Sequence, residues 1–154
     1  MIKTDVIVTN KIWFKYFKNP EFYIKKKVSK LNKANLNFIK SNIFLLSLNL
    51  SDSKQIKKLN SFFRKKNKST DILSFPFYVN KKFEKIKKLN KKVYMGDIII
   101  NIYKLNKKNK EIFEKDFNKL LIHGLLHLFG YNHKKEKDYL AMNKLENQLY
   151  KIIN

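Results

Sequence analysis

The stretch from His123 to His133 constrains the fold more than any other part of the chain. It contains all three histidines of the protein and two of its three glycines. His123 and His127 are four residues apart, so on an α-helix they lie one above the other on the same face. Leucines around them predict that this helix packs against a core, and these are Leu120, Leu121, Leu125 and Leu128.

Gly130 follows the second histidine at the place where a helix commonly ends in a left-handed cap. Such a cap reverses the chain and brings His133 back toward His123 and His127. Three imidazoles with a fourth position left open are the ligand set of a catalytic zinc site. A lone histidine on an apolar face is usually an ordinary core residue, but three of them around a glycine turn favour a metal.

The same spacing occurs in the long metzincin motif, His-Glu-x-x-His-x-x-Gly-x-x-His. Gly124 stands where that motif has its glutamate, which serves as the general base of a zinc peptidase. The sequence therefore predicts a metal site but argues against peptidase chemistry. A zinc peptidase-like hydrolase stays open as an alternative function.

Length and composition bound the class of protein. A chain of 154 residues predicts one domain over residues 1–154 with a substantial core. It has no cysteine, which excludes disulfides and thiolate ligands. The first residues lack the apolar block of a signal peptide, and the most apolar run, residues 43–50, is too short to span a bilayer. We expect a soluble cytoplasmic protein with no membrane partner.

The net charge of +23 comes from 35 Lys and Arg residues against 12 Asp and Glu residues. A lysine-rich surface of this kind attracts phosphate backbones, so we expect a nucleic-acid partner, with no specific indication of DNA. The alternative is a compositional bias across a whole genome, because Lys, Asn, Ile and Phe are all abundant. Much of the charge would then be a solvated coat.

Arg64 is the only arginine in the chain. A guanidinium offers a planar fork for phosphate or carboxylate that lysine cannot reproduce. Arg64 is therefore a candidate functional residue, and a structural salt bridge is the alternative.

Apolar runs predict four strands, over residues 3–9, 43–50, 70–77 and 95–102. Pro76 is expected to place the end of its strand at a sheet edge or to stop the ladder of hydrogen bonds, because proline has no backbone N–H. Gly96 indicates a bulge or the close approach of another backbone.

Helical spacing predicts helices over residues 20–31, 52–63, 105–110, 112–129 and 134–153. The second of these is expected to bury Ile56, Leu59, Phe62 and Phe63. The lysine-rich residues 79–92 are predicted to form a peripheral connection. Because strands come early and helices follow, we predict an α+β fold: one layered domain with a mixed β-sheet covered by helices, and a zincin-like central helix that carries the histidines.

The stretch His123-Gly-Leu-Leu-His-Leu-Phe-Gly-Tyr-Asn-His133 resembles the motif of the YbeY-type endoribonucleases. Three more segments match in the same order, and they are Leu59–Arg64, Thr70–Pro76 and Gly96–Ile100. Met142 and Glu146 also fit the usual tail. The resemblance covers about Leu45 to Leu149.

This resemblance implies a zinc-dependent endoribonuclease that acts on single-stranded RNA. The family trims the 3′ end of 16S rRNA and takes part in ribosome quality control, which implies the small ribosomal subunit as a partner. The zinc ligands carry over to His123, His127 and His133, and the family's arginine carries over to Arg64. Asn132 departs from the family's Asp and cannot act as a charged acceptor; Asp138 is a candidate substitute.

The predicted chemistry places Arg64 and His123 in catalysis. Zinc held by three neutral imidazoles keeps its positive charge and lowers the pKa of bound water to about 7. Arg64 would clamp the phosphate while lysines hold the strand on either side. Tyr131 is a candidate for base stacking, with core packing as its alternative.

The general base is not identified by any motif. Asp71 and Asp97 are candidates because each follows a strand-edge segment, and a turn or cap role is the alternative for both. A third function stays open beside ribonuclease and peptidase, namely a ribosome-associated RNA-binding protein whose zinc is structural.

Overall fold

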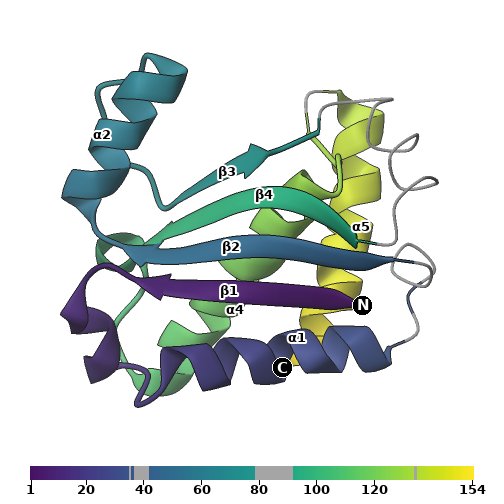
Figure 1. Cartoon of the computed structure of the whole chain (residues 1–154), viewed down its shortest axis with the longest axis horizontal. Coiled ribbons are helices and arrows are strands. Elements are labelled where there is room, and N and C mark those ends of the chain that lie inside the picture. Colours follow the sequence, from purple (N-terminus) through teal and green to yellow (C-terminus); the bar gives the residue numbers. More distant parts are fainter. Residues whose placement is uncertain (35, 37–41, 79–91, 134) are drawn as a thin grey trace.

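The computed structural model describes residues 1–34, 36, 42–78, 92–133 and 135–154. Four strands form one sheet in the order β1-β2-β4-β3 (Figure 1). The strands are β1 (Ile2–Val8), β2 (Ile43–Ser51), β3 (Ile72–Pro76) and β4 (Lys92–Asn101). Strands β1, β2 and β4 pair in parallel, and β3 pairs antiparallel with β4 at the edge. The predicted mixed sheet is confirmed.

Helices pack on both faces of this sheet. In the described part of the chain they are η1 (Lys11–Lys15), α1 (Pro20–Lys33), α2 (Ser53–Arg64), η3 (Ile102–Lys104), α4 (Lys110–Leu128) and α5 (Glu136–Ile153). Figure 1 shows α4 and α5 behind the sheet and α2 at the β3 edge. The predicted α+β class is therefore confirmed. Of the described helices, none has the length and apolar character needed to cross a lipid bilayer.

The helix predicted over residues 105–110 is wrong. The chain forms the short helix η3 just before this segment and then turns. The Asn106 side chain accepts a hydrogen bond from Lys108 N (3.0 Å), and Asp116 accepts one from Asn106 N (2.9 Å). Such side-chain bonds to nearby backbone compete with helix formation. The connection predicted over residues 79–92 lies outside the described residues, except that Lys92 begins β4.

Alternation along β4 divides the interior into two parts. Ile98 and Ile100 face the main core, which α4 covers, whereas Ile99 packs with Ile56 and Leu73 under α2. This follows from the two-residue period of a strand. The two faces of the sheet therefore carry different helices, and β3 is the edge that separates α2 from α4.

The predicted burial of Phe62 and Phe63 is wrong. Their exposed fractions are 69% and 59%, although Ile56 on the same helix is fully buried. Figure 1 shows α2 at the β3 edge, so the last turn of the helix lies beside the outermost strand and not over the middle of the sheet. Phe63 leans on Phe75 of β3, with ring centroids 5.1 Å apart, and is otherwise open.

Gly96 and Pro76 have the roles expected for them. Gly96 has φ +128°, and a Cβ there would lie 2.0 Å from the carbonyl oxygen of Phe75. The register between β2 and β4 shifts between Leu45 and Leu46, opposite this glycine, as at a bulge. Pro76 ends the edge strand β3.

Candidate metal centre

The second half of α4 holds His123 and His127 against the sheet. Gly124 lies between them and faces β3 and β4: a Cβ at this position would be 2.8 Å from Ile72 Cδ1 and 3.0 Å from Ile98 Cγ2. The glycine therefore allows the helix to approach the sheet. A glutamate at position 124, as in the peptidase motif, would drive its side chain into this packing.

The turn after α4 brings the third histidine back. Gly130 has φ +88°, the left-handed conformation predicted for it, and its N–H donates to the carbonyl of His127 (3.0 Å). The ring centroid of His133 then lies 5.7 Å from that of His123 and 5.2 Å from that of His127. The predicted meeting of the three imidazoles is confirmed.

The nitrogen atoms of these rings converge. His123, His127 and His133 each offer one nitrogen, and all three atoms lie within 4.8 Å of one another. The Nε2 atoms of His123 and His127 are 3.0 Å apart. His123 and His127 are half-buried and His133 is exposed, so the group opens to solvent on one side.

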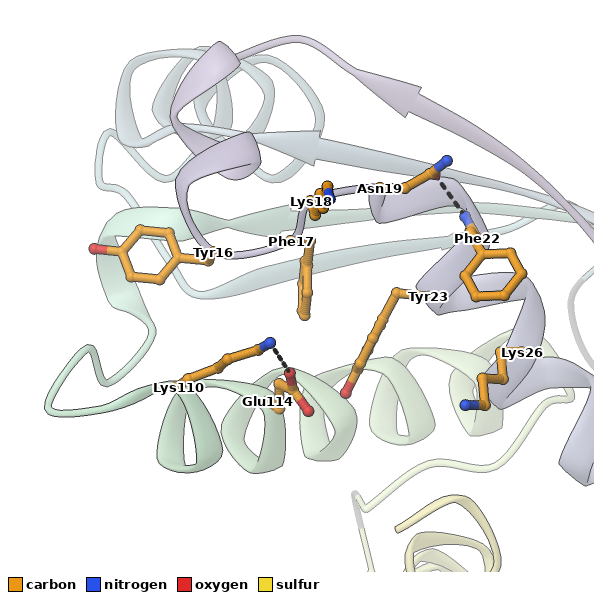
Figure 2. A pocket seen from close by; sticks show the side chains of 9 residues that line it. All are labelled: Tyr16, Phe17, Lys18, Asn19, Phe22, Tyr23, Lys26, Lys110 and Glu114. Carbon is orange, nitrogen blue, oxygen red and sulfur yellow. Dashed lines mark hydrogen bonds and ion pairs between the residues drawn. The ribbon is translucent and has the colours of Figure 1, made fainter.

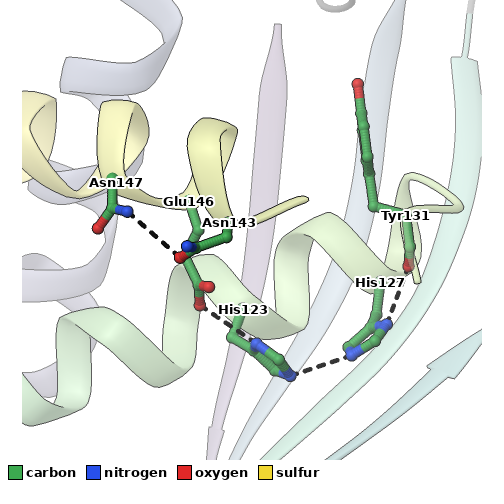
Figure 3. A network of polar contacts seen from close by, with 6 residues as sticks. All are labelled: His123, His127, Tyr131, Asn143, Glu146 and Asn147. Atoms are coloured by element: carbon green, nitrogen blue, oxygen red, sulfur yellow. Dashed lines mark hydrogen bonds and ion pairs between the residues drawn. The ribbon is translucent and has the colours of Figure 1, made fainter. Parts of the chain in front are cut away.

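Two acceptors fix the tautomers of the α4 histidines. Figure 3 shows the chain of contacts: His123 Nδ1 lies 3.2 Å from Glu146 Oε1, and His127 Nδ1 lies 3.0 Å from the Tyr131 carbonyl oxygen. A carboxylate and a carbonyl only accept hydrogen bonds, so each imidazole carries its proton on Nδ1. In the neutral form of each ring the lone pair is then on Nε2, the nitrogen that points toward the other imidazoles. These residues fit a divalent metal.

The environment also keeps His127 neutral. Burial is the largest cause of a lowered pKa for its imidazole, followed by the neighbouring His123. The hydrogen bond to Tyr131 opposes this shift, and His133 and the charge of Arg64 add to it. A neutral imidazole is the form that binds a metal.

Arg64 reaches the same edge of the sheet from the other face. It ends α2, and its Nη2 donates to the carbonyl oxygen of Ser74 on β3 (3.1 Å). Its guanidinium carbon lies 5.8 Å from the ring centroid of Phe75, and its charge acts on His127. Arg64 therefore lies within electrostatic reach of His127, although the two residues are far apart in the sequence.

Two polar residues around the histidines, Ser74 on β3 and Glu146 on α5, were not singled out for a role from the sequence. The Ser74 hydroxyl is buried, and no described residue forms a hydrogen bond with it. Ser74 and Ile72 point to the same side of β3, toward α4, because alternate residues share a face. Glu146 was noted only as part of the tail, and its carboxylate orients His123. The sequence did offer one sign of a role for Ser74, which is a polar residue within an otherwise apolar strand.

The carboxylates considered as general bases lie elsewhere. Asp97 points away from the α4 face, because its neighbour Ile98 faces the main core, and it accepts a hydrogen bond from Tyr94 Oη (2.7 Å). Asp71 accepts from Thr70 Oγ1 (2.9 Å) and from the N–H of Ile72 (2.8 Å), which is a turn role.

The remaining candidates lie around the turn. Asp138 is in the first turn of α5 and is not part of the converging group of ligand atoms found among the described residues. Asn132 is exposed in the turn before His133. Figure 3 shows the Tyr131 ring pointing away from the imidazoles, and this ring packs against the main core.

Comparison with known proteins identifies the family of this chain. The family model described as Endoribonuclease YbeY matches residues 10–154. The Endoribonuclease YbeY of Pelagibacter ubique is 44% identical over 156 residues, which cover 99% of this chain and 97% of that protein. A Buchnera aphidicola protein of the same name is 39% identical over 118 residues, covering 75% of this chain and 72% of its own length.

A solved structure shares the fold. The solution structure of TM1509 from Thermotoga maritima superposes with a TM-score of 0.62 and covers 98% of this chain and 89% of its own. Its sequence identity of 22% supports the fold alone. The family match over most of the chain, together with the near full-length relative, shows that this protein belongs to the YbeY endoribonuclease family.

Proposed function

We propose that this protein is a zinc-dependent endoribonuclease that cleaves single-stranded RNA. Its place would be the maturation of the 3′ end of 16S rRNA and ribosome quality control, on the small ribosomal subunit in the cytoplasm, with residues 1–154 acting as one domain. The observation that carries the proposal is the convergence of one nitrogen from each of His123, His127 and His133, with the first two Nε2 atoms 3.0 Å apart. Family membership supports the choice of RNA as substrate.

Each residue of the site has a separate task in this proposal. His123, His127 and His133 hold the metal, which when bound supplies positive charge and a water of lowered pKa. Arg64 binds the phosphate through its fork, and we assign catalysis to Arg64 and to His123 as the ligand nearest Glu146.

The two other functions are less well supported. Gly124 supplies no peptidase glutamate, and a Cβ at this position would already lie 2.8 Å from Ile72 Cδ1. Closed structural zinc sites normally use four protein ligands, whereas the converging group in the described residues has three and opens to solvent at His133. An open position favours a metal that acts on a substrate.

The test is cleavage of a labelled single-stranded RNA by the purified protein, before and after chelation, beside the variant His127→Gln. We expect zinc to restore cleavage to the chelated wild type, and His127→Gln to lose at least about a thousandfold in rate, which corresponds to about 4 kcal/mol of transition-state stabilisation. Circular dichroism should show an unchanged fold. Undiminished cleavage by His127→Gln would exclude the metal mechanism.

A further inference from the structure

Three phenylalanine rings form a continuous aromatic surface beside Arg64. Phe62 and Phe63 are 69% and 59% exposed, and their ring centroids are 4.9 Å apart. Phe63 in turn lies 5.1 Å from Phe75 of β3. Single exposed phenylalanines are ordinary in a chain with 13 of them, but contiguous exposed rings mark a binding surface.

The same surface is strongly basic. Phe62 forms one wall of a hollow of about 430 Å³ whose other lining residues include no acid, and they are Lys54, Lys57, Lys58, Ser61 and Asn67. The helix α2 (Ser53–Arg64) has four cationic residues and no acidic one. Lys65 Nζ lies 5.7 Å from the centroid of the Phe62 ring. The charged residues that border Phe62 in this hollow and at Lys65 are therefore all cations.

Rings bordered by cations match one kind of ligand. In single-stranded nucleic acids the bases stack on aromatic side chains and the phosphates bind lysines, largely without regard to sequence. A second copy of this chain is disfavoured, because its own charge is also +23. Charge complementarity therefore favours a polyanionic strand over self-association.

The surface is continuous with the candidate metal centre. Arg64 follows Phe63 directly, lies over Phe75, and donates to the carbonyl of Ser74. Ser74 belongs to the edge strand β3, which has Phe75 on the α2 side and faces α4 and its histidines on the opposite side. A strand that crosses α2 therefore passes Arg64 before it reaches the imidazoles.

We propose that Phe62, Phe63 and Phe75, with the lysines of α2, form a base-stacking platform that binds single-stranded RNA and directs it around the β3 edge. This inference rests on the proposed function and adds to it the place where the substrate strand is held. Phe62 separates the lysine hollow from the other rings, and Phe63 joins it to Arg64.

The experiment measures binding of a fluorescent single-stranded oligoribonucleotide by anisotropy, together with KM and kcat for its cleavage. Phe62→Leu and Phe63→Leu keep an apolar side chain of similar size but remove the ring. We expect each to raise Kd and KM about tenfold with kcat little changed. Phe63→Tyr, which keeps the ring, should bind like the wild type.

Matched controls separate this surface from general effects. Phe14→Leu removes another exposed ring (52% exposed), on η1, and should leave Kd unchanged. His127→Gln should bind RNA normally without cleaving it. A Phe62→Leu, Phe63→Leu double variant that binds RNA with the wild-type Kd would overturn the platform. The platform proposal would also be overturned if the wild type dimerised through these rings and the double variant bound RNA with the wild-type Kd.

The two proposals fail in different ways. If the wild type binds RNA through the rings but never cleaves it, the platform stands and the ribonuclease function falls. If the wild type cleaves RNA and the double variant does so with the same KM, the platform falls and the ribonuclease function stands.

Discussion

The two ends of α4 both border a solvent-accessible region, but their polar groups are satisfied differently. At the N-terminal end, a hollow of about 500 Å³ lies between α4, η1 and α1 (Figure 2). Lys110 pairs with Glu114 (3.9 Å), and the Tyr23 hydroxyl donates to Asn118 Oδ1 (3.1 Å). At the C-terminal end, the Nε2 atoms of His123 and His127 face each other at 3.0 Å beside His133.

This difference shows that the volume of a hollow does not identify the candidate functional site. The N-terminal hollow has aromatic walls whose rings pack on one another, such as Phe17 and Tyr23 with centroids 4.2 Å apart. Burial is the largest cause of the raised pKa of Tyr23, which therefore stays protonated and keeps its donor role. Its polar groups stabilise the fold, whereas the three imidazoles at the C-terminal end converge as a group that could hold a metal ion. The predictions below test this division.

The largest expected effect is on stability at the N-terminal end. Phe117→Ala should lower the free energy of unfolding by about 4 kcal/mol, because the ring is fully buried against Trp13 (5.8 Å) and Phe17 (5.1 Å). Urea denaturation measures it, and the exposed Phe14→Ala is the control. Zinc affinity of the folded variant should equal that of the wild type. A loss of zinc binding in folded Phe117→Ala would break the proposed division.

The next effect is on metal affinity at the C-terminal end. Glu146→Ala should weaken zinc binding about 10- to 100-fold, because His123 loses the carboxylate that holds its proton on Nδ1. Competition with a chromophoric chelator measures this without any need for activity. The zinc affinity of Glu146→Gln, which keeps an oxygen acceptor, should lie between that of the wild type and that of Glu146→Ala.

A matched control is available on the same helix. Glu136→Ala removes an exposed carboxylate from the first turn of α5 and should leave zinc affinity unchanged. Equal zinc affinities for Glu146→Ala and Glu136→Ala would mean that the contact between Glu146 and His123 does not orient this imidazole for the metal.

Sequence periodicity predicted the strands and the long helices because their causes are local. Helix α4 follows from apolar spacing and an Asn109 cap, and β4 follows from its β-branched run. Phe62 and Phe63 were predicted wrongly because their burial depends on where α2 ends relative to the sheet edge. That position is set by tertiary packing, which no local pattern contains.

The candidate site divides in the same way. The spacing of the histidines and the left-handed Gly130 predicted that three imidazoles meet, since both are properties of one short segment. Ser74 and Glu146 enter the site only when β3 and α5 pack beside α4, so their place required the structure. Arg64 was found by its rarity, and its position beside Ser74 was not predicted.

The smallest effect sharpens the comparison most directly. Tyr23→Phe removes the donor to Asn118, a fully buried residue whose Nδ2 donates to Asn154 Oδ1 (2.8 Å), and keeps the ring that packs on Phe17. Leaving Oδ1 without its donor should lower the free energy of unfolding by about 1 kcal/mol in thermal or urea unfolding. RNA affinity and zinc affinity should not change, because this hollow has a structural role. A changed RNA affinity at wild-type stability would instead make the N-terminal hollow a second contact for the substrate, and the division between the two ends of α4 would fail.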